Sequence, residues 1–431
     1  METKIIYRAP LGNPNRKYRQ DRFMITTFKA YMTNLRLGIE HCKELGFDWL
    51  EFCWVDPVES RKCMVACEEV GIDGVFQNWE AFGGFAEQTE GKSVEPDKIQ
   101  AYLDEIKKFR HVVGHYVWDE PLKKETMELV RKLVDTMEEM DPDRIPYTVA
   151  LPGVNSYGRN WEKNCYEEYL TEYVDVVDPV VFSLDHYPFK PNTPEPMDQL
   201  DSSPMFLDLA VLRKLSLERK TPMWYYFQAQ DDPWTGSYWK LTAEQVRMQM
   251  FHGMLHGAVG LQNYNVRPGA LNSDGTKGPL FFTTKELNRN AHNLGKTFMA
   301  LTSVGVFHAP ELLANSPHFP QYRQPISDSK ILADKELPFR CSVGEFVDSQ
   351  DNRYLFIQNR DYRVSQKFTL PLKQGFRVYE VSQEDGLQRL KFPKAPFVES
   401  LTVNLAPGDA ALMRFQDPAE APFLIDYVLE K

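Results

Sequence analysis

Two adjacent acids followed by a proline, Asp119-Glu120-Pro121, are the residues of this 431-residue chain best suited to acid–base chemistry. A carboxyl group whose pKa is raised by apolar neighbours and by a nearby like charge holds a proton that it can donate at neutral pH. The alternative interpretation is that one of the two acids only caps the helix predicted over residues 122–140. Taken by themselves, these residues favour neither interpretation.

The element that must position the two acids is a buried strand over residues 112–118, with the sequence Val-Val-Gly-His-Tyr-Val-Trp. A short run of β-branched and aromatic residues is typical of a strand that is covered on both faces. Pro121 has no N–H group, so the strand ends before it. Asp119 and Glu120 therefore lie at the C-terminal end of a strand, where parallel α/β proteins place their catalytic groups.

This strand is the fourth of eight predicted strands that alternate with helices. Such alternation requires parallel strands joined by helical crossovers, and eight units over roughly 280 residues match a closed barrel. No Gly-rich phosphate motif follows the first strand, which counts against a doubly wound nucleotide-binding fold. The predicted strands cover 23–28, 49–54, 74–79, 112–118, 147–151, 180–185, 223–228 and 259–264, and the helices 33–45, 59–70, 96–109, 122–140, 161–173, 205–219, 242–256 and 284–301.

After about Val304 the helical periodicity stops, and several prolines mark a connector. Short runs of alternating apolar and polar residues then follow, separated by turns, which is typical of an antiparallel sandwich. The sequence thus predicts an α/β protein with a (β/α)8 TIM barrel over residues 1–304, the catalytic domain. A smaller C-terminal antiparallel β-sandwich, an accessory domain, is predicted over residues 305–431.

In such a barrel the residues just after each strand converge on one mouth. Here they are acids, amides and large aromatic residues, with hardly any lysine. Carboxylates and amides hydrogen-bond hydroxyl groups, and aromatic faces stack on sugar rings, so we expect a neutral polyhydroxylated ligand. The predicted substrate-binding residues are Asn78, Trp79, Glu80, Trp118, Asp119, Tyr187, Gln228, Gln230, Asn263 and Tyr264, and Asp56, His186, Asp231 and Asp232 lie at the same predicted edge.

The segment Trp118-Asp119-Glu120-Pro121 resembles the Asn-Glu-Pro segment of clan A glycoside hydrolases, the β-galactosidase and cellulase group. In that group the Glu after the fourth strand is the general acid/base, so the resemblance implies this role for Glu120, with Asp119 in place of the usual Asn. Residues 185–188 and 260–264 also resemble segments of bacterial glycosidase-like barrels. The order of barrel and then sandwich is similar to that of many polysaccharide-degrading enzymes.

The chain departs from that group after the seventh strand. Clan A enzymes place the nucleophilic Glu there, whereas this chain has Phe227-Gln228-Ala229-Gln230, and an amide cannot serve as the nucleophile. Glycoside cleavage uses two carboxyl groups, about 5–5.5 Å apart for retention and about 6.5–9.5 Å apart for inversion. We expect Asp185 to be the second catalytic carboxylate, at the wider separation.

Other interpretations remain open at this point. Asp185 could equally be a hydrogen-bond partner of His186 or of a substrate hydroxyl, and Glu80, Asp231 and Asp232 are the next candidates for the second carboxylate. The leading hypothesis is a glycoside hydrolase acting on a neutral oligo- or polysaccharide. A catalytically inactive carbohydrate-binding barrel is the alternative that the glutamine after the seventh strand suggests. A metal-dependent lyase or isomerase is a third.

Composition and other motifs limit the choice of partners. The chain has 50 basic and 61 acidic residues and a formal charge of −11, which argues against nucleic acid as a ligand. The six cysteines are scattered and are expected to be free thiols. His252 and His256 have i, i+4 spacing, but on an outer helix and with Gly253 where a zinc protease has Glu, so we expect no metal and no cofactor.

The sequence says less about location and assembly. No stretch is apolar enough for a membrane span, and Met1-Glu2-Thr3-Lys4 lacks the core of a signal peptide. A periplasmic or secreted location is expected if a leader was removed, and a cytoplasmic one otherwise. The oligomeric state is undetermined.

Overall fold

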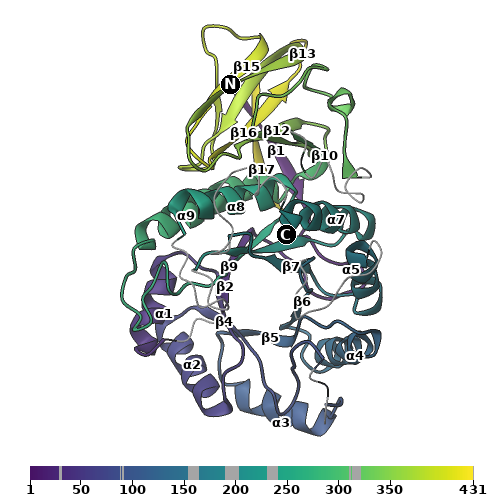
Figure 1. Cartoon of the computed structure of the whole chain (residues 1–431), viewed down its shortest axis with the longest axis vertical. Helices are drawn as coiled ribbons and strands as arrows, with labels where there is room; N and C mark the ends of the chain where they lie inside the picture. Colours follow the sequence, from purple (N-terminus) through teal and green to yellow (C-terminus); the bar gives the residue numbers. More distant parts are fainter. Residues whose placement is uncertain are drawn as a thin grey trace.

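A computed structural model describes residues 1–28, 32–87, 89, 92–153, 165–189, 203–230, 241–309, 312 and 322–430. Eight parallel strands form one sheet in the order β6-β5-β4-β3-β2-β9-β8-β7 (Figure 1). The two end strands approach each other: Ala150, just after β6, forms a parallel bridge with Leu184 of β7. The sheet is therefore a nearly closed barrel, and the predicted (β/α)8 fold is confirmed.

Each strand and helix expected for the barrel corresponds to an observed element in the described part of the chain, with ends that differ by a few residues. The barrel strands are β2 (Met24–Phe28), β3 (Trp49–Phe52), β4 (Asp73–Phe76), β5 (Val112–Asp119), β6 (Ile145–Val149), β7 (Phe182–His186), β8 (Met223–Gln228) and β9 (Gly260–Tyr264). The helices are α1 (Leu35–Glu44), α2 (Pro57–Val70), α3 (Pro96–Ile106), α4 (Lys124–Met140), α5 (Cys165–Val176), α7 (Pro204–Arg219), α8 (Ala243–Leu255) and α9 (Phe281–Phe298).

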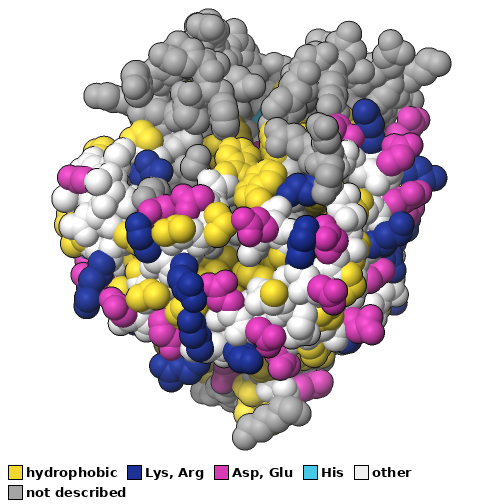
Figure 2. Space-filling model, turned by 90° about the horizontal axis from the view of Figure 1, so that it is seen from below, with side chains coloured by type: hydrophobic (Ala, Val, Ile, Leu, Met, Phe, Trp, Pro, Cys, Tyr) yellow, Lys and Arg dark blue, Asp and Glu magenta, His cyan; other side chains and the backbone are white. Residues whose placement is uncertain are grey.

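The helices surround the barrel, and those such as α4 pack on it through one apolar side. In α4, Met127, Val130, Val134 and Met137 recur at helical spacing and are buried against the sheet. The outward faces carry acidic and basic side chains interspersed (Figure 2), with ion pairs such as Arg61–Glu105. No described helix is both long enough and apolar enough to cross a membrane.

The C-terminal part is an antiparallel sheet in the order β10-β11-β12-β16-β13-β14, with β15 paired to β13, as expected. Its apolar side chains form a core of their own, which includes Leu355, Ile357 and Leu370. The strands are β10 (Thr302–His308), β11 (Cys341–Val347), β12 (Arg353–Asn359), β13 (Gln366–Val381), β14 (Gln388–Leu390), β15 (Val398–Leu405) and β16 (Ala410–Gln416), and a short 3-10 helix, η3 (Ile326–Asp328), precedes β11.

The two ends of the chain pair with each other, which the sequence analysis did not anticipate. Strand β1 (Glu2–Arg8) runs parallel to β17 (Phe423–Leu429), and both are drawn near the junction of barrel and sheet in Figure 1. The division of the chain at residue 304 stays a prediction. Strand β10 starts at Thr302, close to that position, and already pairs with β11 of the C-terminal sheet.

The barrel and the C-terminal sheet share a continuous apolar contact along α8 and α9. The rings of Phe298 and Phe356 meet edge to face with centroids 5.1 Å apart, and Phe251 packs on Phe356 at 5.8 Å. The Gln358 amide donates a hydrogen bond to the carbonyl oxygen of Met248 at 2.7 Å. Cys42, Cys53, Cys63, Cys67 and Cys341 are buried free thiols, as expected.

Candidate active site

The end of β5 holds its two acids in a fixed backbone. The Asp119 N–H donates to the carbonyl oxygen of Gly84 at 3.0 Å, and the Glu120 N–H donates to that of Val149 at 3.2 Å. Glu120 has a φ of 53°, in the left-handed region that is uncommon for residues other than glycine. Both acids are buried, with exposed fractions of 6% for Asp119 and 8% for Glu120.

The carboxyl group of Asp119 holds its proton at neutral pH. Burial raises its pKa to about 8, and the negative charge of Asp185 adds to the shift. The Tyr116 hydroxyl donates a hydrogen bond to Asp119 Oδ1 at 2.9 Å, which stabilises the ionised form and opposes part of the rise. Asp119 is thus a neutral acid that can donate a proton.

Asp185, in β7, is the third acid of the site and has an exposed fraction of 8%. Burial raises its pKa to about 6, while hydrogen bonds from Tyr187 and Glu120 and the charge of His186 limit the rise. Among the described residues, its Oδ1 atom has no hydrogen-bond partner. We refer to Asp119, Glu120 and Asp185 as the acid cluster.

The acid cluster brings together residues that the sequence placed two strands apart. The Glu120 and Asp185 carboxyl groups are hydrogen-bonded to each other. The two carboxyl groups are therefore close together in the structure described, and the wider, inverting separation expected for this pair stays a prediction for the site with substrate bound.

Two tyrosines predicted to bind substrate form a wall beside the acid cluster. Tyr187 and Tyr264 stack with ring centroids 4.3 Å apart, and Phe28 packs on Tyr264 at 5.3 Å. Tyr187 also hydrogen-bonds Asp185, so this ring lies directly against the cluster. The two aromatic side chains thus come from the ends of β7 and β9, on either side of β8.

His186 is held by a different acid from the one considered in the sequence analysis. Its Nδ1 atom lies 2.6 Å from Oδ2 of Asp208 in α7, and the same oxygen accepts a hydrogen bond from the Gly153 N–H at 2.9 Å. Asp208 therefore fixes the ring of His186. The side chain of Asp185 remains directed to Tyr187 and Glu120.

Two further residues that were predicted to bind substrate instead form hydrogen bonds to the backbone of loops. Trp118 is fully buried, and its indole N–H donates to the carbonyl oxygen of Ala86 at 3.1 Å, beneath the loop that follows β4. Gln228 pairs with the backbone of Phe189, donating to its carbonyl oxygen at 2.8 Å and accepting from its N–H at 2.9 Å. A carboxylate could not make both contacts, which gives a structural reason for the amide.

The residues after β4 build a turn. The Asn78 side chain accepts hydrogen bonds from the N–H groups of Glu80 and Ala81, both at 3.0 Å. Glu80 is exposed, and the ring of the half-buried Trp79 has the Lys92 ammonium 5.0 Å from its centroid. Asp56 similarly caps α2 by accepting from Val58 and Glu59.

Asn263 differs from these residues because its amide is buried and, in the described part of the chain, neither its oxygen nor its nitrogen has a hydrogen-bond partner. A buried amide without partners is costly, so it is a candidate to bind a substrate hydroxyl. Gln230 is also buried. Asp231 and Asp232 lie outside the described residues.

A fourth acid, Glu51, was missed. It lies fully buried in β3 and accepts hydrogen bonds from Thr26 at 2.7 Å, from Gln262 at 3.1 Å and from two further donors, the Trp49 indole and the Tyr226 hydroxyl. Burial raises its pKa, and its charge contributes to the raised pKa of Asp119. A single acid inside the apolar run of residues 49–54 was the available signal.

Comparison with known proteins finds structures that share the fold. No known family and no curated relative matches the chain. A candidate alpha-galactosidase/melibiase from Bacteroides fragilis NCTC 9343 matches over 93% of this chain and 80% of its own, with 12% identity and a TM-score of 0.53. A catalytic mutant of a GH42 beta-galactosidase from G. stearothermophilus matches over 93% of this chain and 99% of its own, with 8% identity and a TM-score of 0.58. The expected likeness to glycosidase barrels is thus confirmed at the level of fold.

Proposed function

We propose that the chain is a glycoside hydrolase that cleaves a neutral oligo- or polysaccharide with the acid cluster. The observation that carries the proposal is the difference between Asp119, with a pKa of about 8, and Asp185, with a pKa of about 6. Two neighbouring carboxyl groups whose environments separate their pKa values provide a proton donor and a carboxylate at the same pH. The shared fold with two proteins described as galactosidases supports the same reaction.

Asp185 supplies the carboxylate in this proposal. It acts as base on a water molecule or as nucleophile at the anomeric carbon, while a proton passes to the glycosidic oxygen and the C–O bond breaks. The donor comes from the end of β5. Glu120 is the donor that the sequence predicts, and Asp119 is a second candidate because its carboxyl group stays protonated up to about pH 8.

The hydrogen bond between Glu120 and Asp185 describes the site without a sugar. A glycosyl ring needs carboxyl groups about 5 Å apart or more, so the Glu120 side chain has to turn away from Asp185 when substrate enters. Tyr187, Tyr264 and the Asn263 amide, which has no hydrogen-bond partner among the described residues, are then available to a ring and its hydroxyl groups. These are the groups expected for a neutral saccharide.

The test compares Asp185→Asn, Glu120→Gln and Asp119→Asn on glycosides with good and poor leaving groups. A dinitrophenyl group leaves without protonation, so loss of the proton donor slows its release little but slows methyl glycoside cleavage by about 10²–10⁴-fold. Loss of Asp185 should slow both substrates. The matched control is Glu128→Gln on the exposed side of α4.

The proton donor is the residue, Glu120 or Asp119, whose replacement slows cleavage of the methyl glycoside far more than cleavage of the dinitrophenyl glycoside. Unchanged turnover of both substrates in all three variants would contradict the proposal. The inactive carbohydrate-binding barrel gains no support from Gln228, since that amide is used to hold Phe189. Calorimetry that shows saccharide binding without any product would nevertheless favour it.

A further inference from the structure

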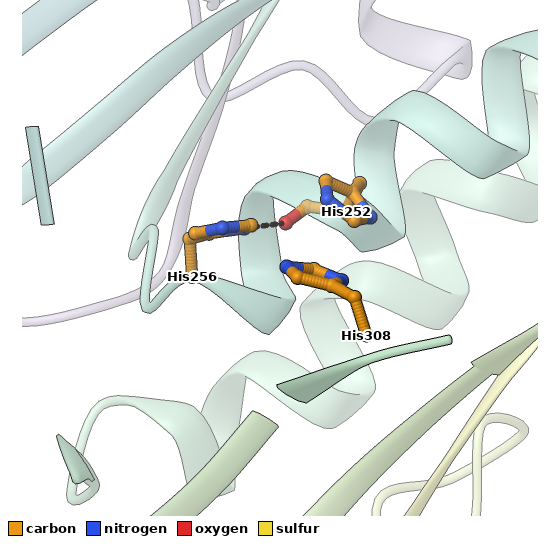
Figure 3. A group of neighbouring side chains, drawn as sticks. All are labelled: His252, His256 and His308. Carbon is orange, nitrogen blue, oxygen red and sulfur yellow. Dashed lines mark hydrogen bonds between the residues drawn. The ribbon is translucent and has the colours of Figure 1, made fainter. Parts of the chain in front are cut away.

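Three histidines meet where the barrel joins the C-terminal sheet (Figure 3). His252 and His256 come from the end of α8, and His308 comes from β10. One nitrogen atom from each ring lies within 4.8 Å of the other two. The sequence analysis saw the first two residues but not the third, which lies far away in the chain.

Hydrogen bonds fix which nitrogen of His252 carries the proton. Its Nδ1 lies 2.7 Å from Oε1 of Gln358, and the amide nitrogen of Gln358 is directed to the carbonyl oxygen of Met248. The Gln358 oxygen is therefore an acceptor, and His252 Nδ1 must donate. The Nε2 atom of His252 keeps its lone pair, is buried, and has no hydrogen-bond partner among the described residues.

Hydrogen bonds also hold the other two rings in place. His256 Nδ1 donates to the carbonyl oxygen of His252 at 3.0 Å, the contact dashed in Figure 3, which leaves a lone pair on its Nε2. His308 Nδ1 lies 2.8 Å from Oγ of Ser342. Metal-binding histidines usually have one nitrogen oriented by such a hydrogen bond and the other directed to the ion.

The three rings lie in buried surroundings with two positive charges nearby. Burial lowers the pKa of each ring below its usual value, and the charges of Arg213 and Arg360 add to this effect.

The two arginines also oppose a bare cation. Arg360 donates to Ser342 Oγ at 2.7 Å, and Arg213 donates to Ser303 Oγ at 2.8 Å. Their charges favour an ion that carries an anionic fourth ligand, such as hydroxide or a carboxylate. A cavity of about 870 Å³, lined by His256, His308 and Arg213, gives such a ligand access to the cluster.

We propose that His252, His256 and His308 bind a divalent transition-metal ion of the Zn²⁺ type, with an anion from the cavity as fourth ligand. Three histidines with one open position are a known tetrahedral zinc arrangement, with Zn–N distances of about 2.0–2.1 Å. That geometry needs nitrogen atoms about 3.4 Å apart, so nitrogen atoms that now lie up to 4.8 Å apart must approach each other by up to about 1.4 Å. The ion ties α8 to β10 and so stabilises the junction of barrel and sheet.

The test uses the whole chain, stripped with chelator and titrated with Zn²⁺ and with Co²⁺. We expect one ion per chain, a rise in melting temperature, and the intense visible absorption of tetrahedral Co²⁺. His308→Gln removes one ligand and should weaken binding at least about 100-fold. Gln358→Met keeps all three ligands but removes the contact that orients His252, so it should weaken binding about 10–100-fold.

The matched control is His111→Asn, a partly exposed histidine outside the cluster that pairs with Asp73. It should bind both ions as the unchanged chain does. The proposal is contradicted if the unchanged chain binds no ion, or if His308→Gln binds Co²⁺ with the same affinity and spectrum. Binding is read from the ion itself, so the result does not depend on glycosidase activity.

Discussion

At the scale of single residues, the acid cluster shows that two side chains of the same type have different pKa values because their neighbours differ. Asp119 and Asp185 are both buried, yet only Asp185 receives hydrogen bonds from two side chains and the charge of a histidine. The pKa of Asp185 is therefore raised less than that of Asp119. The identity of the residues did not predict this difference, because it depends on neighbours from other strands.

The raised pKa values predict a bell-shaped pH dependence of kcat/KM. Turnover needs an ionised Asp185 and a protonated donor, so activity should rise through about pH 6 and fall through about pH 8 if Asp119 is the donor. The two apparent pKa values belong to the interacting cluster. Initial rates on a methyl glycoside across pH 4–10 measure both limbs, and a flat profile would contradict the prediction.

The same shifts predict how stability changes with pH. The pKa of Asp119 is higher in the folded chain than its ordinary value of 3.8. The stability that its protonated form contributes is therefore fully present below pH 4 and is lost as pH rises through about 8. Asp119→Asn removes the ionisation, so this variant should be more stable than the unchanged chain at pH 9, by up to a few kcal/mol.

Urea unfolding of Asp119→Asn at pH 5 and pH 9 measures this difference. At pH 5 residue 119 is neutral in both folded forms, but the unfolded unchanged chain is already ionised there, so the variant should be somewhat more stable at pH 5 and clearly more stable at pH 9. The control Glu128→Gln changes an exposed acid and should show no such pH-dependent gain. A gain at pH 9 no larger than that at pH 5 would argue against a buried neutral Asp119.

At the scale of elements, the barrel could be predicted because its signals are local. Helical spacing and short apolar runs, read over ten to twenty residues, are enough to place strands and helices. The path of a loop is not encoded in this way. Trp118 was expected at the mouth, but it lies under the loop after β4, and Gln228 was expected to bind substrate, but it holds Phe189.

The loop over Trp118 gives a prediction at this scale. A β-carbon at Gly84 would overlap the indole ring of Trp118, so Gly84→Ala should displace the ring and the end of β5. We expect a loss of about 1–3 kcal/mol in the free energy of unfolding and reduced turnover. Gly375→Ala is the matched control, because the nearest atom to its β-carbon is 3.7 Å away and it should change stability by less than about 0.5 kcal/mol.

At the scale of the whole molecule, the pairs that the sequence analysis missed are those between distant parts of the chain. Glu51 is recognisable as a site residue only when Gln262 and Tyr226 are brought beside it, and His252 and His256 only when His308 is. One sequence contains no signal for such contacts. The pairing of β1 with β17 is a third example.

That pairing predicts different costs for two adjacent residues. Ile6 has an exposed fraction of 2% and packs with Phe423 and Ile425 of β17, whereas Ile5 is 54% exposed. Ile6→Ala should lower the free energy of unfolding by about 2–3 kcal/mol, and Ile5→Ala by about 0.5 kcal/mol or less. Denaturant curves measured side by side test this, and equal losses would contradict the packing.

The pairing of β1 with β17 also determines the order in which parts of the chain can fold. During synthesis, β1 leaves the ribosome long before its partner exists. Even β2, whose partner β9 is the most distant one within the barrel, can pair once Tyr264 has been made, well before β17. The barrel can therefore close around its helices while β1 still waits, and the first strand to be made is among the last to be docked.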